Sequence, residues 1–223
     1  MRRVLTVGVM AIVVLWTIPA AAQTAPAGNV PAGPIVNSWY VGINTGAAVV
    51  ENFGGVVGVE GGFRVWRNLD IIGEIVGVKN SVSRAELDRI QLLAQSISPT
   101  VGGPGTGTMK VPTLYGGVGA RWVIENSGLF RPYFLFAVGG AKRELQPTLV
   151  VNGKDITADP APYGVTLGQD VIGKYKDVAT EGGVGVVAGF GSWYIDGGAR
   201  LISISGDERV NIARIVIGGG YRF

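Results

Sequence analysis

From residue 38 onward, apolar residues alternate with small or polar residues. In WYVGINTGAAVV, residues 39–50, most odd positions are apolar and most even positions are small or polar. The stretch VVGVEGGFRVW, residues 56–66, repeats the pattern. Alternation by two is the period of a β-strand. The pattern therefore predicts an all-β fold.

Eight segments carry this alternation. Most exceed the five or six residues that are usual for strands of globular proteins. They match the roughly 9–11 residues that a tilted strand needs to cross a bilayer. The predicted strands span residues 38–50, 55–67, 69–80, 111–124, 131–145, 178–191, 193–205 and 210–223.

The two faces of these strands differ in character. One face is almost free of charge and carries residues such as Val118, Trp193 and Leu201, as expected for a surface that faces lipid. The other face is dominated by glycine, which weakens an isolated strand and indicates close packing. Isolated charges of both signs lie on that face: Glu60, Arg64, Asp70, Glu74, Arg121, Glu181, Asp196, Arg200, Arg214, Arg222 and, if its strand takes the matching register, Arg143. An eight-stranded barrel has an interior that side chains can fill, so we expect these residues to form a charge network in its lumen.

Aromatic residues and loop lengths distinguish the two ends of the predicted barrel. Many aromatics fall near the strand ends that meet the termini, as in the girdles at membrane interfaces: Trp39, Trp66, Trp122, Tyr133, Trp193, Tyr194, Tyr221 and Phe223. Connections at that end are short. At the opposite end, two connections are tight, at 51–54 and 206–209, and two are long, at 81–110 and 146–177. We expect a rim that is low on one side and covered on the other.

The long connections contain local signals of their own. SVSRAELDRIQLLAQSI starts with a possible capping box, Ser83 and Glu86, and places an apolar stripe on one face of a short helix. The stripe either packs onto the barrel rim or binds a partner. The following SPTVGGPGTGT is expected to be flexible, and NGKD, residues 152–155, is expected to form a hairpin turn.

The first residues have the composition of an export signal. Arg2 and Arg3 precede an apolar run that ends in AAA, residues 20–22, so we expect a signal peptide over 1–22 that is cleaved near Ala22. Residues 23–37 are rich in Pro, Gly and Ala and are interpreted as a flexible leader. The chain has 19 Lys and Arg against 16 Asp and Glu, and loss of the two arginines leaves 17 against 16. A nearly neutral chain gives no reason to expect a nucleic-acid partner.

Two residue types are missing from the whole sequence. The chain has no Cys, which excludes thiolate metal or redox sites, and no His, the commonest general base and metal ligand. Ser203, Ser205 and Asp207 therefore have no base that could activate a nucleophile. We expect no enzymatic activity, no catalytic residues, and no cofactor or metal site.

The strands YGGVGARW, FLFAVGGA, GGVGVVAGF and IDGGARL, with the terminal GGGYRF, resemble small outer-membrane β-barrels of the OmpA and OmpX type. The resemblance covers 38–223 and implies an eight-stranded antiparallel transmembrane up-and-down β-barrel in the outer membrane of a Gram-negative-type bacterium. It also implies a C-terminal assembly signal at Gly218, Tyr221 and Phe223, although Val216 stands where a polar residue is usual. The peptidoglycan-binding domain of larger members is not expected.

The resemblance also implies partners. These are outer-membrane lipid and lipopolysaccharide, the barrel-assembly machinery and periplasmic chaperones; the sequence names no extracellular partner. Three functions remain open: an integral outer-membrane barrel with a structural or surface-interaction role, a narrow porin-like channel or lateral conduit for small apolar solutes, and a secreted soluble barrel that binds a ligand.

Overall fold

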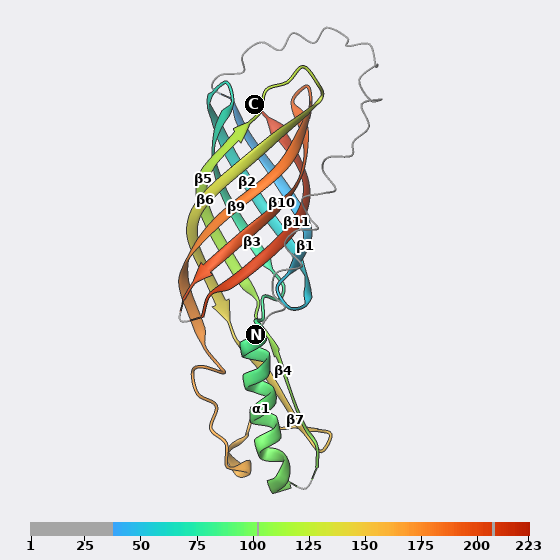
Figure 1. Ribbon diagram of the computed structural model, residues 1–223, viewed down its shortest axis with the longest axis vertical. Coiled ribbons are helices and arrows are strands. Elements are labelled where there is room, and N and C mark those ends of the chain that lie inside the picture. Colours follow the sequence, from blue (N-terminus) through green and yellow to red (C-terminus); the bar gives the residue numbers. More distant parts are fainter. Residues whose placement is uncertain (1–37, 102, 207) are drawn as a thin grey trace, which may run out of the picture. The chain divides into compact units, whose positions relative to one another are not determined.

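The computed structural model describes residues 38–101, 103–206 and 208–223, so the expected signal peptide (1–22) and leader (23–37) lie outside the described residues. Eight antiparallel strands form a closed barrel, which confirms the predicted fold (Figure 1). Each predicted strand is present, with bounds that differ from the prediction by a few residues. The barrel strands are β1 (Trp39–Val49), β2 (Phe53–Trp66), β3 (Leu69–Val78), β5 (Thr113–Val123), β6 (Phe130–Glu144), β9 (Lys174–Phe190), β10 (Trp193–Ser205) and β11 (Val210–Arg222).

The last strand closes the barrel on the first. Strands β1 and β11 pair antiparallel, with Val41 opposite Tyr221 and Val49 opposite Ala213. Beyond the strand, the amide of Phe223 donates a hydrogen bond to the carbonyl of Trp39 over 2.9 Å. Closure gives the edges of both strands a partner, and an unpaired edge would otherwise invite aggregation.

We call the end of the barrel where β1 begins and β11 ends the terminal end, and the opposite end the far end. At the far end, β1 connects to β2 through 50–52 and β10 connects to β11 through 206–209. The other two connections carry further structure, which confirms the predicted difference in loop length. They contain α1 (Arg84–Val101), β4 (Gly105–Lys110), β7 (Gln146–Val151), β8 (Lys154–Asp155) and the short 3-10 helix η3 (Ala161–Tyr163).

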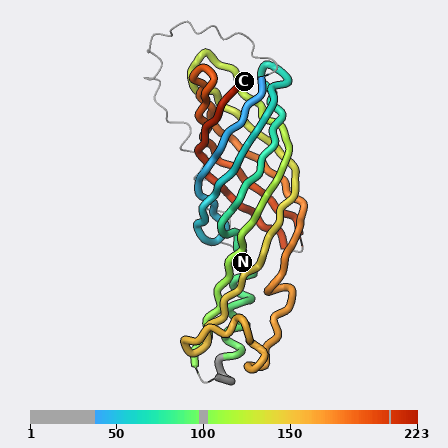
Figure 2. Tube along the Cα trace, turned by 180° about the vertical axis from the view of Figure 1, so that it is seen from behind, coloured from blue at the N-terminus to red at the C-terminus, as the bar shows by residue number. Residues whose placement is uncertain are grey.

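These elements form what we call the loop subdomain, residues 81–112 and 145–173. Strands β4, β7 and β8 form a separate three-stranded sheet. Figure 2 shows the chain of this subdomain, in green and yellow to orange, beyond the far end of the barrel. The apolar stripe of helix α1 packs against β4 and β7 inside this subdomain, so the expectation that it packs onto the barrel rim or binds a partner is wrong. The subdomain has a hydrophobic core of its own: Val82, Ile90, Ala94, Ile97, Met109, Val111, Leu145, Leu149, Val151, Ile156 and Val171.

The helix prediction is confirmed, but the expectation of a flexible SPTVGGPGTGT is wrong. The helix continues to Val101, and residues 105–110 form β4. The glycines of this stretch serve close packing, because a Cβ at Gly105 or Gly107 would collide with the carbonyls of Ala94 or Ile90 on α1. Composition alone cannot distinguish glycine used for contact from glycine used for flexibility.

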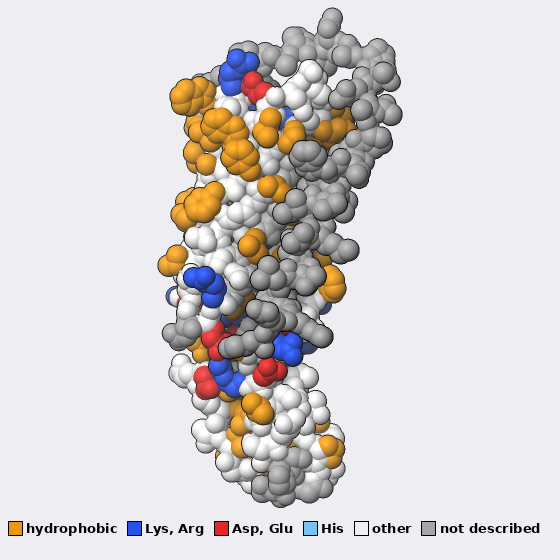
Figure 3. All heavy atoms as spheres, in the orientation of Figure 1, with side chains coloured by type: hydrophobic (Ala, Val, Ile, Leu, Met, Phe, Trp, Pro, Cys, Tyr) orange, Lys and Arg blue, Asp and Glu red, His pale blue; other side chains and the backbone are white. Residues whose placement is uncertain are grey.

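The outer wall of the barrel is apolar. Side chains such as Ile43, Ile75 and Ile215 are at least 60% exposed although they are aliphatic, and Figure 3 shows hydrophobic side chains over the barrel strands. Such a belt is typical of a membrane-spanning barrel. Among the described helices, none is both long and apolar enough to cross a bilayer.

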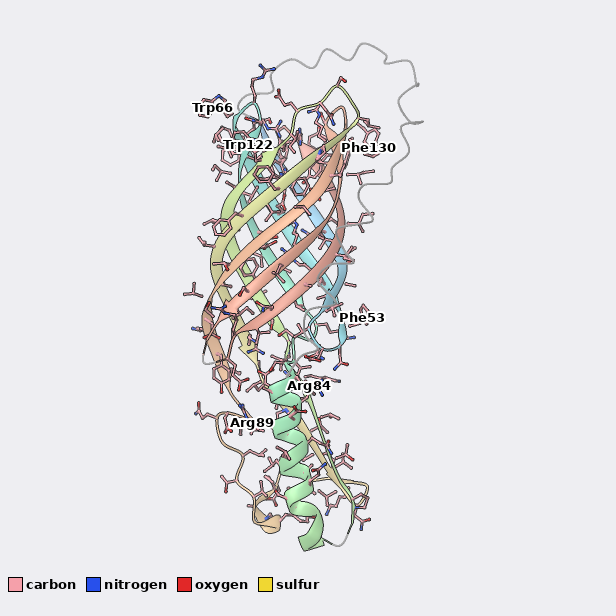
Figure 4. All side chains as sticks on the ribbon, viewed as in Figure 1. Phe53, Trp66, Arg84, Arg89, Trp122 and Phe130 are labelled. Carbon is pink, nitrogen blue, oxygen red and sulfur yellow. The ribbon has the colours of Figure 1, made fainter. Side chains whose placement is uncertain are left out.

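Aromatic side chains gather at the terminal end of this belt. Trp66, Trp122 and Phe130 point outward there, whereas Phe53 is exposed at the far end (Figure 4). Two of the aromatics expected in the girdle are placed differently. Tyr133 and Tyr194 are buried and point into the lumen, because each has the same parity along its strand as the luminal charges.

Candidate functional site: the lumen and the loop subdomain

Three buried tyrosines, Tyr40, Tyr133 and Tyr194, fill part of the lumen, and glycines on adjacent strands make room for them. The ring of Tyr40 occupies the place that a side chain on its cross-strand partner Gly62 would need. Tyr133 lies over its own partner, Gly185, in the same way. The glycine-rich inner face is therefore a packing surface for large side chains.

Arg121 is the centre of one half of the luminal charge network. Its guanidinium lies 3.0 Å from the carboxylate of Glu60, 3.1 Å from that of Asp70 and 3.2 Å from that of Asp196. Asp70 also pairs with Arg64 at 2.5 Å. The Arg121 guanidinium lies over the ring of Tyr40, 4.7 Å from its centroid, in cation–π geometry.

Arg200 and Arg214 extend the network toward the far end. Arg200 pairs with Glu60 at 2.9 Å and with Glu74 at 3.0 Å. Arg214 pairs with Glu74 at 2.9 Å and also with Glu181. Shared carboxylates thus join four arginines and five acids into one buried network. Each charge has an opposite charge beside it, which burial in a low-dielectric interior requires.

Nine of the eleven residues that the sequence places in the lumen belong to this network, and the other two lie outside it. Arg143 lies near the far end of β6 and pairs with Glu86 of α1 at 2.8 Å, outside the network. Arg222 stacks over the ring of Tyr194, with 5.5 Å between its Cζ and the ring centroid. The Nε atom of Arg222 is buried without a hydrogen-bond partner.

An apolar layer fills the lumen between the charge network and the far end. It consists of side chains that are almost fully buried: Ala48, Val56, Val76, Val78, Tyr115, Ala141, Ala179, Ile202, Ile204, Val210 and Ile212. Beside the network, a pocket of about 10 Å³ lies among Asn44, Glu60, Asp196 and Arg200. That volume corresponds to about one water molecule. The Asn44 Oδ1 and Arg200 Nε atoms are buried without hydrogen-bond partners.

A buried joint connects the loop subdomain to the barrel. Glu86 accepts a hydrogen bond from the amide of Ser83 over 2.7 Å, which is one half of the predicted capping box, and pairs with Arg143. The hydroxyl of Ser81 lies 2.5 Å from that of Thr113 at the start of β5. On the low side of the rim, Arg89 pairs with Glu208 at 2.6 Å. The capping motif can be predicted from the sequence, but the pairing of Glu86 with Arg143 depends on the tertiary fold.

The predicted NGKD turn is present between β7 and β8. Asn152 and Gly153 have φ angles of 49° and 75°, as a two-residue hairpin turn requires. Asp155 accepts hydrogen bonds from the hydroxyl and the amide of Thr157, and these hold the pKa of its carboxyl below the usual value. Within the described residues, no three acidic side chains are grouped so that they could hold a metal ion.

Comparison with known proteins supports the fold and adds no activity. No family model and no curated protein matches the sequence. The structure is similar to that of Neisserial surface protein A (NspA), with a TM-score of 0.52 and 12% identity over 84% of this chain and 97% of that one. It is also similar to a major outer membrane protein from Thermus thermophilus, with a TM-score of 0.50 and 8% identity over 84% of this chain and 100% of that one.

These similarities confirm, at the level of the fold, the predicted likeness to small outer-membrane barrels. Together with the apolar outer wall, they agree with the predicted location in the outer membrane. The protein has the fold of small outer-membrane β-barrels.

Proposed function

We propose that the protein is a closed outer-membrane barrel that anchors and displays the loop subdomain at the cell surface, with a structural or surface-interaction role. The observation that carries this proposal is the separate hydrophobic core of the subdomain. Loops that only connect strands do not need such a core, whereas a surface that must keep its shape for a partner does. The joint between Arg143 and Glu86 would hold that surface in a fixed place on the rim.

The filling of the lumen supports a role without conduction. A solute would have to pass the tyrosines, the charge network and the apolar layer in turn. Arg121 and Arg214 are at most 1% exposed, and each is held by at least two carboxylates. Moving one of these guanidinium groups aside would leave unpaired charges inside the membrane, which costs several kcal/mol, on the order of 3–5. The filling of the lumen by the described residues therefore does not support the narrow-channel alternative.

We further propose that the role is not enzymatic and that the partners include outer-membrane lipid, lipopolysaccharide, the barrel-assembly machinery and periplasmic chaperones. The lack of His in the sequence supports the first point. The exposed apolar wall supports the contact with lipid. The terminal residues Gly218, Tyr221 and Phe223, on the closing strand and just after it, are proposed as the assembly signal.

Two measurements test this proposal. The protein should sediment with outer membranes and migrate faster on a gel before boiling in detergent than after, whereas a secreted soluble barrel would not. In planar bilayers, the purified protein should show no steady single-channel current. A steady current that changes in Glu74→Ala, which removes a carboxylate shared by Arg200 and Arg214, would refute the closed lumen and favour the channel.

The display role has its own test. Protease added to intact cells should cleave only within 81–112 and 145–173, because these residues form the subdomain. Cleavage within the short 206–209 connection would contradict this arrangement.

A further inference from the structure

The lysines of this protein have a distribution unlike that of its arginines. All six lysines, Lys79, Lys110, Lys142, Lys154, Lys174 and Lys176, lie at the far end of the barrel or in the loop subdomain. The buried network in the lumen uses arginine alone. Lysine is a flexible point charge whose stem can lie along apolar surface while its ammonium reaches polar surroundings. This distribution suits contact with anions at the outer boundary of the membrane belt.

Two of these lysines face each other on the outer wall. Lys142 of β6 and Lys176 of β9 are direct cross-strand partners, and both are exposed. The next outward pair toward the membrane belt is Gly140 and Val178, and the valine is 66% exposed. The lysines therefore lie where the apolar wall ends. Like charges directly opposite each other destabilise a sheet unless a counter-charge lies between them.

The acid nearest to them along β6, Glu144, does not form an ion pair with either lysine. Glu144, one step further along the outer face of β6, pairs with Lys174 at 3.6 Å. No ion pair is found for Lys142, Lys176 or Lys79 within the part of the chain that the structure describes. The outer face of this corner thus has three lysines without an acidic partner, and an external anion would relieve their repulsion.

An apolar groove begins beside these lysines. It has a volume of about 650 Å³ and runs over the outer wall of β1, β2, β3 and β5, where Val57, Gly77 and Leu114 help to line it. Three charged residues also line it: Lys79 just after β3, and Lys142 and Glu144 on β6. Glu144 is paired with Lys174, which leaves the two lysines free to contact an occupant. An occupant that fits must have apolar chains for the groove and more than one negative group for the separate lysines.

We propose that this corner binds lipid A, the bisphosphorylated lipid part of lipopolysaccharide. Its acyl chains lie in the groove lined by Val57, Gly77 and Leu114, and its phosphates contact Lys79 and the Lys142–Lys176 pair. This inference rests on the proposed outer-membrane location and names the lipid-binding site within it. A phospholipid with a single phosphodiester offers these lysines one phosphate, whereas lipid A offers two.

The test uses the full barrel in a zwitterionic detergent and native mass spectrometry to measure bound lipid. The probes are lipid A, the same lipid after removal of both phosphates, and phosphatidylglycerol. Lipid A should bind about tenfold more tightly than either other probe, because the dephosphorylated lipid makes no charge-assisted hydrogen bonds through phosphate and phosphatidylglycerol makes them through one phosphate only. In Lys142→Gln/Lys176→Gln, this preference should disappear. It should persist in Lys110→Gln/Lys154→Gln, which loses the same charge on the subdomain, and in Lys142→Arg/Lys176→Arg.

Three results would overturn the inference: equal binding of lipid A with and without phosphates, equal binding of phosphatidylglycerol, or an unchanged preference in the double glutamine variant. A gel-mobility assay shows whether each variant still forms the compact barrel. Failure of the wild-type protein to form a barrel in outer membranes would refute the proposed function. Binding that does not depend on phosphate in an intact barrel would refute only this site.

Discussion

The guanidinium of Arg143 lies 2.8 Å from the carboxylate of Glu86, and this buried pair joins the barrel wall to the first turn of helix α1. The same carboxylate accepts a hydrogen bond from the amide of Ser83 and so caps the helix. One side chain therefore both starts the helix and attaches it to the barrel. The joint makes the loop subdomain depend on the barrel without sharing its core.

Replacing Glu86 with Gln should loosen the subdomain and leave the barrel intact. Breaking a buried ion pair by removing one charge costs about 3–5 kcal/mol, because the other charge stays buried. Limited proteolysis of the folded protein in detergent should then show faster cleavage within 84–112. Asp88→Asn is the matched control, since its pair with Arg84 is exposed and long, at 3.9 Å. Equal cleavage of wild type and Glu86→Gln would show that the joint does not hold the subdomain.

Removing the charge of Arg121 should be among the most damaging single changes in the barrel. Arg121→Met keeps much of the side-chain volume but leaves Glu60 and Asp196 each short of a pairing cation, so we expect a loss of about 3–5 kcal/mol. The measurement is urea unfolding of the protein in lipid vesicles, followed by tryptophan fluorescence. Arg67→Met should change stability by less than about 1 kcal/mol, because its partner Glu125 lies at 3.5 Å in an exposed pair. Similar losses in both variants would contradict the importance of burial.

The alternation of residues was enough to predict the strands, their number and the closing pair. It could not show where a strand leaves the barrel, because the period of two continues past the rim. Arg143 follows the luminal parity of β6 but lies beyond the apolar layer, so its partner comes from α1. For Tyr133, the alternation was the better guide. Its position in the alternation places it on the inner face of β6, where it lies, whereas its position near a strand end led to the wrong prediction of a place in the aromatic girdle.

Substitution of a luminal glycine tests whether the lumen is tightly packed, and the adjacent glycine in the sequence serves as the control. In Gly62→Ala, the new methyl group would meet the ring of Tyr40, whereas in Gly61→Ala the nearest atom is a backbone oxygen at 3.6 Å. Overpacking of a filled interior costs about 1–3 kcal/mol, so only Gly62→Ala should lower the unfolding midpoint clearly. Unfolding of both variants in vesicles measures this. A larger loss in Gly61→Ala would mean that the glycines matter for strand flexibility rather than for the ring.

The hydrogen bonds of Asp155 give the β7–β8 turn a defined dependence on pH. Because its pKa is lowered in the folded protein, the carboxylate stabilises the turn above its usual pKa of 3.8, and this contribution is lost as the pH falls below that value through the folded pKa. Carbon-detected NMR should find the Asp155 titration below 3.8. Thr157→Val should raise the Asp155 pKa toward 3.8, because the hydrogen bond from the Thr157 hydroxyl is lost. Thr148→Val, on the exposed face of β7, should leave the titration in place.

Deletion of Phe223 distinguishes a role of this residue in outer-membrane assembly from a role in the stability of the folded barrel. Phe223 is 74% exposed, packs edge-on against Tyr221 and gives one backbone hydrogen bond to Trp39, so its loss should cost the folded barrel only about 1 kcal/mol. Refolding of the purified variant into detergent should therefore be nearly normal. If Phe223 belongs to the assembly signal, the same variant should accumulate in the periplasm of cells. Phe130→Ala, an exposed aromatic that Figure 4 places at the same end, should insert normally. Normal insertion of the Phe223 deletion would refute the signal, and failure to refold in detergent would assign the defect to stability.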